Sequence, residues 1–179
     1  MSHYLSSLLF QSFLSLRIRI SLLFFFISCS SFDRFDIQGH RGAAGLFPEN
    51  TVEGFVQTIK LGVTTLEMDV VITKDLKVIV SHEPWISNKK CIDKRGNDIS
   101  DNILNENIFT MTYDEIQNYD CGSLFSQKNI KQTKKPLVKP LLSDVILSVE
   151  KNTQSNIRYN IEIKSDIKGD EIFHPKYDQ

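Results

Sequence analysis

Residues 37–85 constrain the fold most, because a strand, a loop, a helix and a second strand are predicted to follow one another there. The first strand covers residues 35–40 and ends in a glycine-rich loop. The helix has Asn50 as its predicted N-cap, and apolar residues recur at i, i+3, i+4 and i+7 from Val52 onward. The second strand, residues 63–73, is rich in β-branched side chains. A strand–helix–strand unit of this length favours a parallel sheet and hence an α/β fold.

The pattern loosens over residues 86–135, where Asn, Asp, Lys and Gly are frequent. We interpret this stretch as an insertion with a small apolar core and a short helix over residues 112–118. The predicted core residues of the insertion are Ile103, Leu104, Ile108, Phe109, Ile116, Tyr119 and Phe125. Helical periodicity returns over residues 142–149, with Ser143 as the expected N-cap, and residues 159–164 are a third predicted core strand. With only three βα steps, the chain is expected to hold part of a larger domain.

Residues 1–29 are predicted to be a signal peptide of the lipoprotein type. Arg17 and Arg19 precede an apolar run over residues 20–27, and small residues follow it, which is the secretory pattern. The run is shorter than the roughly 20 apolar residues that span a bilayer. The residues that end in Cys29 resemble a bacterial lipobox, so Cys29 is a candidate for lipidation. We expect an exported protein, periplasmic or anchored as a lipoprotein; the alternative is a plain cleaved or anchoring leader.

The overall composition is that of one ordinary globular domain, residues 35–179, behind the leader. Lys and Arg total 21 against 22 for Asp and Glu, a balance that gives no basic excess for binding nucleic acid. If Cys29 carries lipid, Cys91 and Cys121 remain as an even pair in an oxidising compartment, and a disulfide between them is possible. Two unrelated buried thiols are the alternative.

Charged and titratable side chains gather at the ends of the predicted strands. Glu67 and Asp69 are two residues apart on one strand, so both carboxylates face the same side of the sheet. Two neighbouring anions repel each other unless a cation lies between them, although a solvated strand face is the simpler reading. His40 and His82 each follow a predicted strand. This combination suits hydrolysis of a phosphate ester with a hard metal ion.

Five short motifs in order resemble the glycerophosphodiester phosphodiesterase family. They are His40-Arg41-Gly42, Pro48-Glu49-Asn50-Thr51, Glu67-x-Asp69, the motif around His82, and Ile161-Glu162-Ile163-Lys164. The resemblance implies a (β/α)8 TIM barrel, present here as its N-terminal part over residues 35–179, with the insertion at about 86–135. The family's usual His-Asp pair is His82-Glu83 in this chain. A full barrel takes about 250 residues.

The resemblance also implies an activity, namely hydrolysis of glycerophosphodiesters to an alcohol and sn-glycerol 3-phosphate, in lipid and glycerol metabolism. It implies that Glu67, Asp69 and Glu162 hold one divalent cation, Ca²⁺ or Mg²⁺, because all three offer hard oxygen ligands. The implied partner is a small-molecule substrate. Nucleic acid is not expected, and contact with the membrane is expected only through the N-terminal anchor.

The other motif residues take implied roles in proton transfer and phosphate binding. His40 and His82 are the expected acid–base pair, because imidazole titrates near neutral pH. Arg41 and Lys164 are expected to bind the substrate phosphate. An ion pair with Glu162 is the alternative role for Lys164. For Glu49, a role in the site and a role in loop structure remain equally open.

Two rival functions remain open from the sequence. The first is a related barrel phospholipase, either phospholipase D-like or phosphoinositide-cleaving, which shares the histidine and carboxylate chemistry. The second is an inactive exported binding remnant, because part of a barrel leaves strand edges unpaired. For the same reason, we expect the 179-residue chain alone to be inactive.

Overall fold

The computed structural model describes residues 35–124, 130–153 and 156–176. The predicted leader, the candidate lipidation site Cys29 and the expected core residue Phe125 lie outside these ranges. Within them, no helix combines the length and the apolar character that a membrane span requires.

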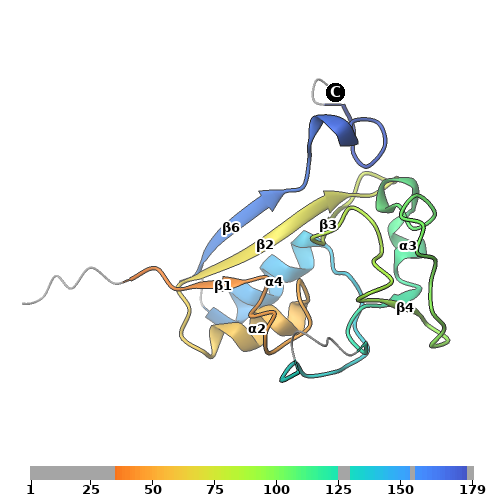
Figure 1. Cartoon of the computed structure of the whole chain (residues 1–179). Helices are drawn as coiled ribbons and strands as arrows, with labels where there is room; N and C mark the ends of the chain where they lie inside the picture. Colours follow the sequence, from red (N-terminus) through yellow and green to blue (C-terminus); the bar gives the residue numbers. More distant parts are fainter. Residues whose placement is uncertain (1–34, 125–129, 154–155, 177–179) are drawn as a thin grey trace, which may run out of the picture. The chain divides into compact units, whose positions relative to one another are not determined.

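The sheet is built around one long central strand, β2, which spans Thr65–Ile72 (Figure 1). β1 (Gln38–His40) pairs with the first part of β2 in parallel, and β6 (Arg158–Ile163) pairs in parallel along its other edge. β3 (Val78–Val80) pairs with the last part of β2 in antiparallel orientation. The predicted parallel α/β sheet is confirmed. The strand predicted before His82 is present as β3, and it is antiparallel because the turn after β2 is too short for a crossover.

Two helices cover the face of the sheet that forms the main core. α2 (Val52–Ile59) connects β1 to β2, and α4 (Leu142–Thr153) precedes β6. Both helices lie below the sheet in Figure 1. The buried residues that they enclose with the strands are Phe55, Leu66, Met68, Val80, Val145 and Val149. On the other face of β2, Glu67 and Asp69 are polar, and Val71 packs into the smaller core described below.

Both expected helix N-caps were wrong by one or two positions. The N-cap of α2 is Thr51, whose hydroxyl accepts a hydrogen bond from the Gly54 amide at 3.1 Å. Asn50, the predicted cap, has a left-handed backbone with φ of 56°, a conformation that asparagine tolerates better than most residues. Its side chain turns instead toward β2. α4 begins at Leu142, so Ser143 lies within its first turn.

The insertion forms a second, smaller layer with its own core. A two-stranded ribbon joins β4 (Ile92–Asp93) to β5 (Tyr119–Asp120), and the short helix α3 (Tyr113–Ile116) lies between these strands in the chain. A 3-10 turn, η1 (Ile108–Thr110), precedes α3. The predicted short helix is confirmed, and Thr112 caps it through a capping box.

The core of the insertion differs in part from the predicted one. Its buried residues are Val71, Ile79, Ile86, Cys91, Ile108 and Ile116, and Tyr119 packs against them. Ile103 and Leu104 were predicted to join this core, but they are 40% and 58% exposed. Both lie in a run of asparagine-stabilised turns, where the backbone cannot place successive side chains inward. Cys91 and Cys121 form a disulfide that closes a loop of 30 residues.

Gly54 lies where α2 touches the loop after β1, and we predict that it cannot be enlarged. A Cβ atom at Gly54 would stand 2.9 Å from both the Pro48 carbonyl oxygen and the Thr51 hydroxyl. Gly54→Ala should lower the free energy of unfolding by about 1–3 kcal/mol, although alanine favours helices. The measurement is urea unfolding, with Gly45→Ala as the control, because a Cβ at Gly45 has no atom within 4 Å. Equal stability of the two variants would contradict this.

Candidate active site

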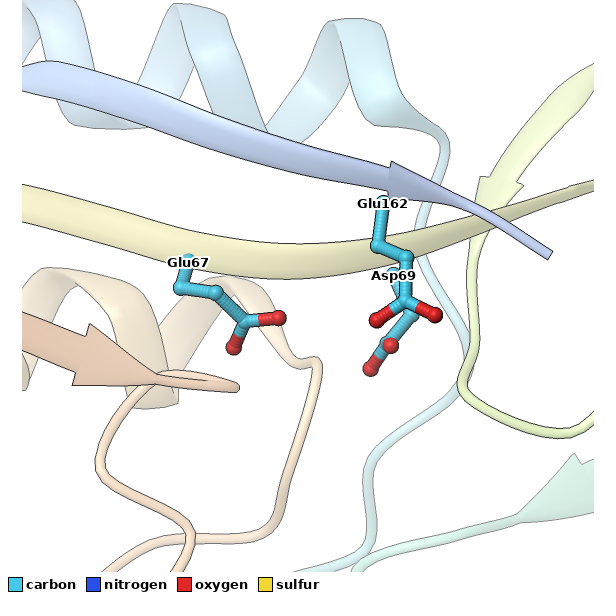
Figure 2. Close-up of side chains that lie close together, drawn as sticks. All are labelled: Glu67, Asp69 and Glu162. Atoms are coloured by element: carbon cyan, nitrogen blue, oxygen red, sulfur yellow. The ribbon is translucent and has the colours of Figure 1, made fainter.

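Three carboxylates lie together on the polar face of the sheet (Figure 2). Glu67 and Asp69 come from β2, where alternate residues face the same side, as the sequence predicts. Glu162 comes from β6, whose register places it directly opposite Asp69. One oxygen from each residue lies within 4.8 Å of the others. The parallel pairing of β2 with β6 thus brings together acids that are 93 or more residues apart in the chain.

Two cations compensate the charge of this cluster. The Lys164 ammonium lies 2.6 Å from Glu162 Oε1 and 3.0 Å from Asp69 Oδ1. Arg41 Nε lies 3.2 Å from Asp69 Oδ2. Burial raises the pKa of Asp69, but the hydrogen bond from Asn50 and the two cations outweigh it and the pKa is lowered. Asp69 is therefore ionised at neutral pH although it is fully buried.

The donor set of the three carboxylates fits a hard divalent cation. All three ligands are carboxylate oxygens, which Ca²⁺ and Mg²⁺ prefer. Oxygens on opposite sides of a Ca²⁺ ion are about 4.6–5.2 Å apart, and those around Mg²⁺ about 4.0–4.2 Å. The three oxygens lie within 4.8 Å of one another, so a single hard cation could be held between them. The Lys164 ammonium occupies part of the same space, so it must turn away when an ion binds.

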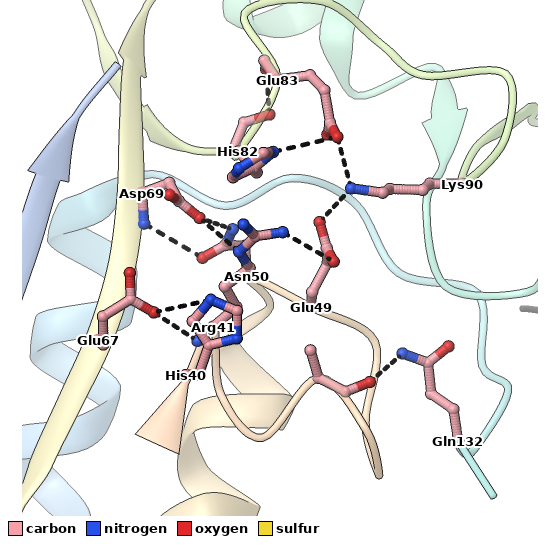
Figure 3. A network of polar contacts seen from close by, with 12 residues as sticks. His40, Arg41, Glu49, Asn50, Glu67, Asp69, His82, Glu83, Lys90 and Gln132 are labelled. Atoms are coloured by element: carbon pink, nitrogen blue, oxygen red, sulfur yellow. Dashed lines mark hydrogen bonds and ion pairs between the residues drawn. The ribbon is translucent and has the colours of Figure 1, made fainter. Parts of the chain in front are cut away.

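The loop after β1 contributes the residues on one side of the cluster (Figure 3). His40 ends β1, and its Nε2 atom lies 4.0 Å from Glu67 Oε2. The Arg41 amide donates to the same oxygen at 2.8 Å, and Arg41 has φ of 51°. Asn50 donates from Nδ2 to Asp69 Oδ2 at 2.9 Å. Left-handed backbone at Arg41 and Asn50 is the kind of local strain that often accompanies a functional loop.

The segment after β3 contributes the residues on the other side. His82 Nδ1 lies 3.2 Å from Glu83 Oε1. Lys90, from the insertion, donates to Glu83 Oε1 and to Glu49 Oε1, both at 2.6 Å. Arg41 Nη1 lies 3.5 Å from the other oxygen of Glu49. A continuous chain of charged groups therefore connects Asp69, through Arg41, to His82 (Figure 3).

A cavity of about 420 Å³ opens beside the carboxylates. His82, Glu162 and Lys164 line it on the polar side, and Trp85 and Phe173 line it on the apolar side, with ring centroids 5.6 Å apart. His82 is thereby brought to the carboxylate cluster. His40 reaches the cluster from the opposite side, through Glu67.

Sequence analysis missed four residues of this site. Asn50 was interpreted as a helix cap, Glu83 as a departure from the family motif, and Lys90 and Lys139 were not assigned a role. Lys139 is buried and faces Glu83 and Glu49. The residues around Lys139 give no sequence signal for its burial, because lysine is usually exposed.

Burial shifts the pKa values of the groups behind His82. Burial raises the pKa of Glu83, but the Lys90 ammonium opposes this and holds the pKa at about 2. Burial lowers the pKa of Lys139 to about 8, against the opposing effect of the Glu83 and Glu49 carboxylates. At neutral pH both groups are therefore charged, and they form an ionic layer under the site.

Comparison with known proteins places these features in a family. The model of the glycerophosphoryl diester phosphodiesterase family matches residues 40–172, which include every charged group described above. Lysophospholipase D GDPD1 of Homo sapiens is 50% identical over 44 residues, which cover 25% of this chain and 14% of that protein.

Solved structures show the same architecture. A candidate glycerophosphoryl diester phosphodiesterase from Silicibacter pomeroyi superposes with a TM-score of 0.68 and 31% identity, over 76% of this chain and 48% of that one. A phosphodiesterase from Oleispira antarctica, in complex with sn-glycerol-3-phosphate, superposes with a TM-score of 0.56 and 20% identity, over 75% of this chain and 47% of that one. The chain spans about half the length of these structures.

The buried Lys139 predicts a pH dependence of stability. The pKa of Lys139 is about 8 in the folded protein and 10.5 as the ordinary value, so the folded state holds fewer protons between these pH values. Because the unfolded state binds this proton more tightly, the free energy of unfolding should rise by about 3 kcal/mol as the pH increases from about 8 to 10.5. The same gain should be lost when the pH is lowered again to about 8. Lys139→Met should lack this rise.

The measurement is urea unfolding of both proteins at several pH values across this window. The difference between the two curves isolates Lys139, because tyrosines and the remaining lysines titrate in both proteins. Parallel curves for the two proteins would contradict the prediction.

Proposed function

The chain belongs to the glycerophosphoryl diester phosphodiesterase family, and on this premise we propose that its site hydrolyses a glycerophosphodiester to an alcohol and sn-glycerol 3-phosphate. Members of the family are phosphoric diester hydrolases. The observation that supports the proposal is the meeting of Glu67, Asp69 and Glu162 beside Arg41 and Lys164. Such a site can accept a phosphodiester anion only if a cation compensates the three acids, which agrees with the divalent-metal dependence of the family.

Glu67, Asp69 and Glu162 would hold the cation, with Ca²⁺ or Mg²⁺ as the candidates. When bound, such an ion neutralises the charge of a phosphodiester and polarises its phosphorus–oxygen bonds. Asn50 and the Arg41 amide hold Asp69 and Glu67 in place by hydrogen bonds at 2.9 and 2.8 Å. The ligands are thus oriented before any substrate arrives.

Arg41 and Lys164 would bind the phosphate of the substrate. Arg41 offers a planar guanidinium whose Nε already contacts Asp69, so its position is restrained. Lys164 is a point charge on a flexible stem, and it can turn from Glu162 toward a phosphate oxygen of the substrate. Both cations also stabilise the additional negative charge that develops as the attacking oxygen bonds to phosphorus.

The two histidines provide proton transfer. One imidazole takes the proton of the attacking oxygen as the new phosphorus–oxygen bond forms. The other gives a proton to the departing alkoxide as the old bond breaks. His40 lies beside Glu67 and His82 lines a cavity with Glu162, so both imidazoles lie near the proposed cation site. The product bound in the Oleispira antarctica enzyme, sn-glycerol-3-phosphate, is the product proposed for this chain.

A lysophospholipase D is the second candidate, because 44 residues are 50% identical to the human protein of that name. The two activities differ in the phosphodiester that fits and in the products released. Assays of sn-glycerol 3-phosphate release from glycerophosphocholine and of choline release from lysophosphatidylcholine separate them.

The leader and the disulfide support export of the protein. A bond between Cys91 and Cys121 is typical of oxidising compartments. We expect labelled palmitate to be incorporated into the protein when it is expressed in a bacterial host, and Cys29→Ala to abolish the label. Cys91→Ala provides the control for loss of a cysteine elsewhere. Equal labelling of the wild-type and Cys29→Ala proteins would exclude lipidation at this position.

The proposed metal site predicts a specific loss on mutation. Glu67→Gln keeps the shape of the side chain and removes a ligand charge, so it should lower kcat/KM for glycerophosphocholine by about 100-fold or more. The measurement is enzyme-coupled detection of sn-glycerol 3-phosphate released by the complete protein, after treatment with EDTA and with Ca²⁺ or Mg²⁺ added back. Glu53→Gln is the matched control, because Glu53 pairs with Lys135 away from the site. Full activity in EDTA would refute the metal role.

A further inference from the structure

One charged side chain of the insertion, Lys90, lies in the candidate active site. Its ammonium lies 2.6 Å from Glu83 Oε1 and 2.6 Å from Glu49 Oε1, so it joins the segment after β3 to the loop after β1 (Figure 3). Lys90 is about one-third exposed, whereas Glu83 is largely buried. The contact therefore crosses from the insertion to the segment that carries one of the proposed acid–base residues.

Glu83 is the group through which Lys90 reaches His82. The same carboxylate oxygen, Oε1, accepts from Lys90 Nζ and lies 3.2 Å from His82 Nδ1. The pKa of Glu83 is about 2, because the nearby Lys90 ammonium outweighs the effect of burial, so Glu83 is a carboxylate at neutral pH. A carboxylate can only accept hydrogen bonds, which requires the proton of His82 to be on Nδ1. Nε2 is then the nitrogen free to exchange a proton.

We propose that Lys90 is a positioning residue, whose ammonium holds the Glu83 carboxylate against Nδ1 of His82 and thereby presents Nε2 to the substrate. The proposal deepens the proposed phosphodiesterase function and rests on it for the role of His82. On this proposal the insertion takes part in catalysis, because it provides the ammonium group that orients His82. The carboxylate–histidine pair follows the general logic by which a buried acid orients a catalytic imidazole.

The disulfide fixes the backbone from which Lys90 projects. Cys91, the next residue, is buried in the core of the insertion and bonded to Cys121. The amides of Lys90 and Cys91 both donate to the Ser87 carbonyl, at 2.9 and 2.8 Å, so the segment is a closed turn. Anchoring one end of a flexible lysine in this way lowers the entropy lost when its ammonium is held between two carboxylates. Reduction of the disulfide should therefore weaken the hold on Glu83.

A purely structural ion pair is the alternative role for Lys90, and it makes a different prediction. Ion pairs that join two loops contribute to stability, whichever histidine tautomer is present. A positioning residue also changes the tautomer of His82 and kcat. The charged groups that face Glu83 are Lys90, Lys139 and His82, and of these Lys90 alone comes from the insertion. Replacement of Lys90 thus removes the contact and leaves Lys139 in place.

The test is ¹⁵N NMR of the histidine rings in the complete protein, recorded over a range of pH so that the neutral form of His82 is observed directly. The His82 signals are assigned by their loss in His82→Gln. In the wild-type protein we expect the Nδ1-protonated tautomer, and in Lys90→Met a mixture of both tautomers. Lys89→Met is the matched control, because Lys89 is the exposed neighbouring lysine, and it should match the wild type.

Kinetics supply the second readout on the same variants. Lys90→Met should lower kcat about 10- to 100-fold with little change in KM, and Lys90→Arg should restore part of it. Treatment of the wild-type protein with dithiothreitol should move the His82 tautomer in the same direction. If Lys90→Met does not fold, Lys90→Gln takes its place with the same expected direction, since its amide cannot supply the ionic contact.

The outcomes separate the two proposals. An unchanged His82 tautomer together with wild-type kcat in the Lys90 variant would overturn the positioning role. Absence of phosphodiesterase activity from the complete wild-type protein, with every added metal, would overturn the proposed function. If the His82 tautomer still depended on Lys90 in that case, the contact between Lys90 and Glu83 would stand without the phosphodiesterase role. Loss of stability with unchanged tautomer and kcat would assign Lys90 to the structural ion pair.

Discussion

The ionised carboxylate of Asp69, fully buried in the middle of β2, is the constraint on which the rest of the site depends. An isolated charge at such a position is too costly to bury, so the fold must surround it with donors and cations. Asn50 and Arg41, from the loop after β1, and Lys164, which follows β6, do this. Removing any of the three weakens the compensation of this buried charge, which links the stability of the sheet to the integrity of the site.

Parallel pairing explains why these partners meet. β1 and β6 flank β2, and the chain leaves both strands at the same edge of the sheet, where the loop with Arg41 and the end of β6 with Lys164 come together. Each flanking element therefore delivers one basic side chain to the same acid. The same edge holds the ligands proposed for a cation, and strand ends of this kind are where barrels of this class place their chemistry.

The insertion adds a second level of organisation to this arrangement. Its own small core and disulfide make it rigid enough to place Lys90 between Glu49 and Glu83. Two loops of the barrel segment are thus joined by a residue that belongs to neither. Glu83 contacts both His82 and Lys90, and the buried Lys139 lies near enough to Glu83 to shift its pKa. Electrostatic interactions among such partly buried groups are stronger than they would be in water.

The sequence by itself determined the features that depend on local periodicity. Alternation along β2 was enough to place Glu67 and Asp69 on one face, and helical spacing was enough to predict α2 and the capped helix α3. The tertiary structure decided which loops became neighbours, and therefore that Asn50 binds Asp69 and does not cap α2. It also decided that Ile103 and Leu104 stay exposed while Lys90 and Lys139 reach buried acids. The physical reason is that the direction of a side chain along a strand or helix depends on local backbone geometry, which the nearby sequence determines. The partners of a buried charge come from segments that are distant in the chain and meet only when it folds.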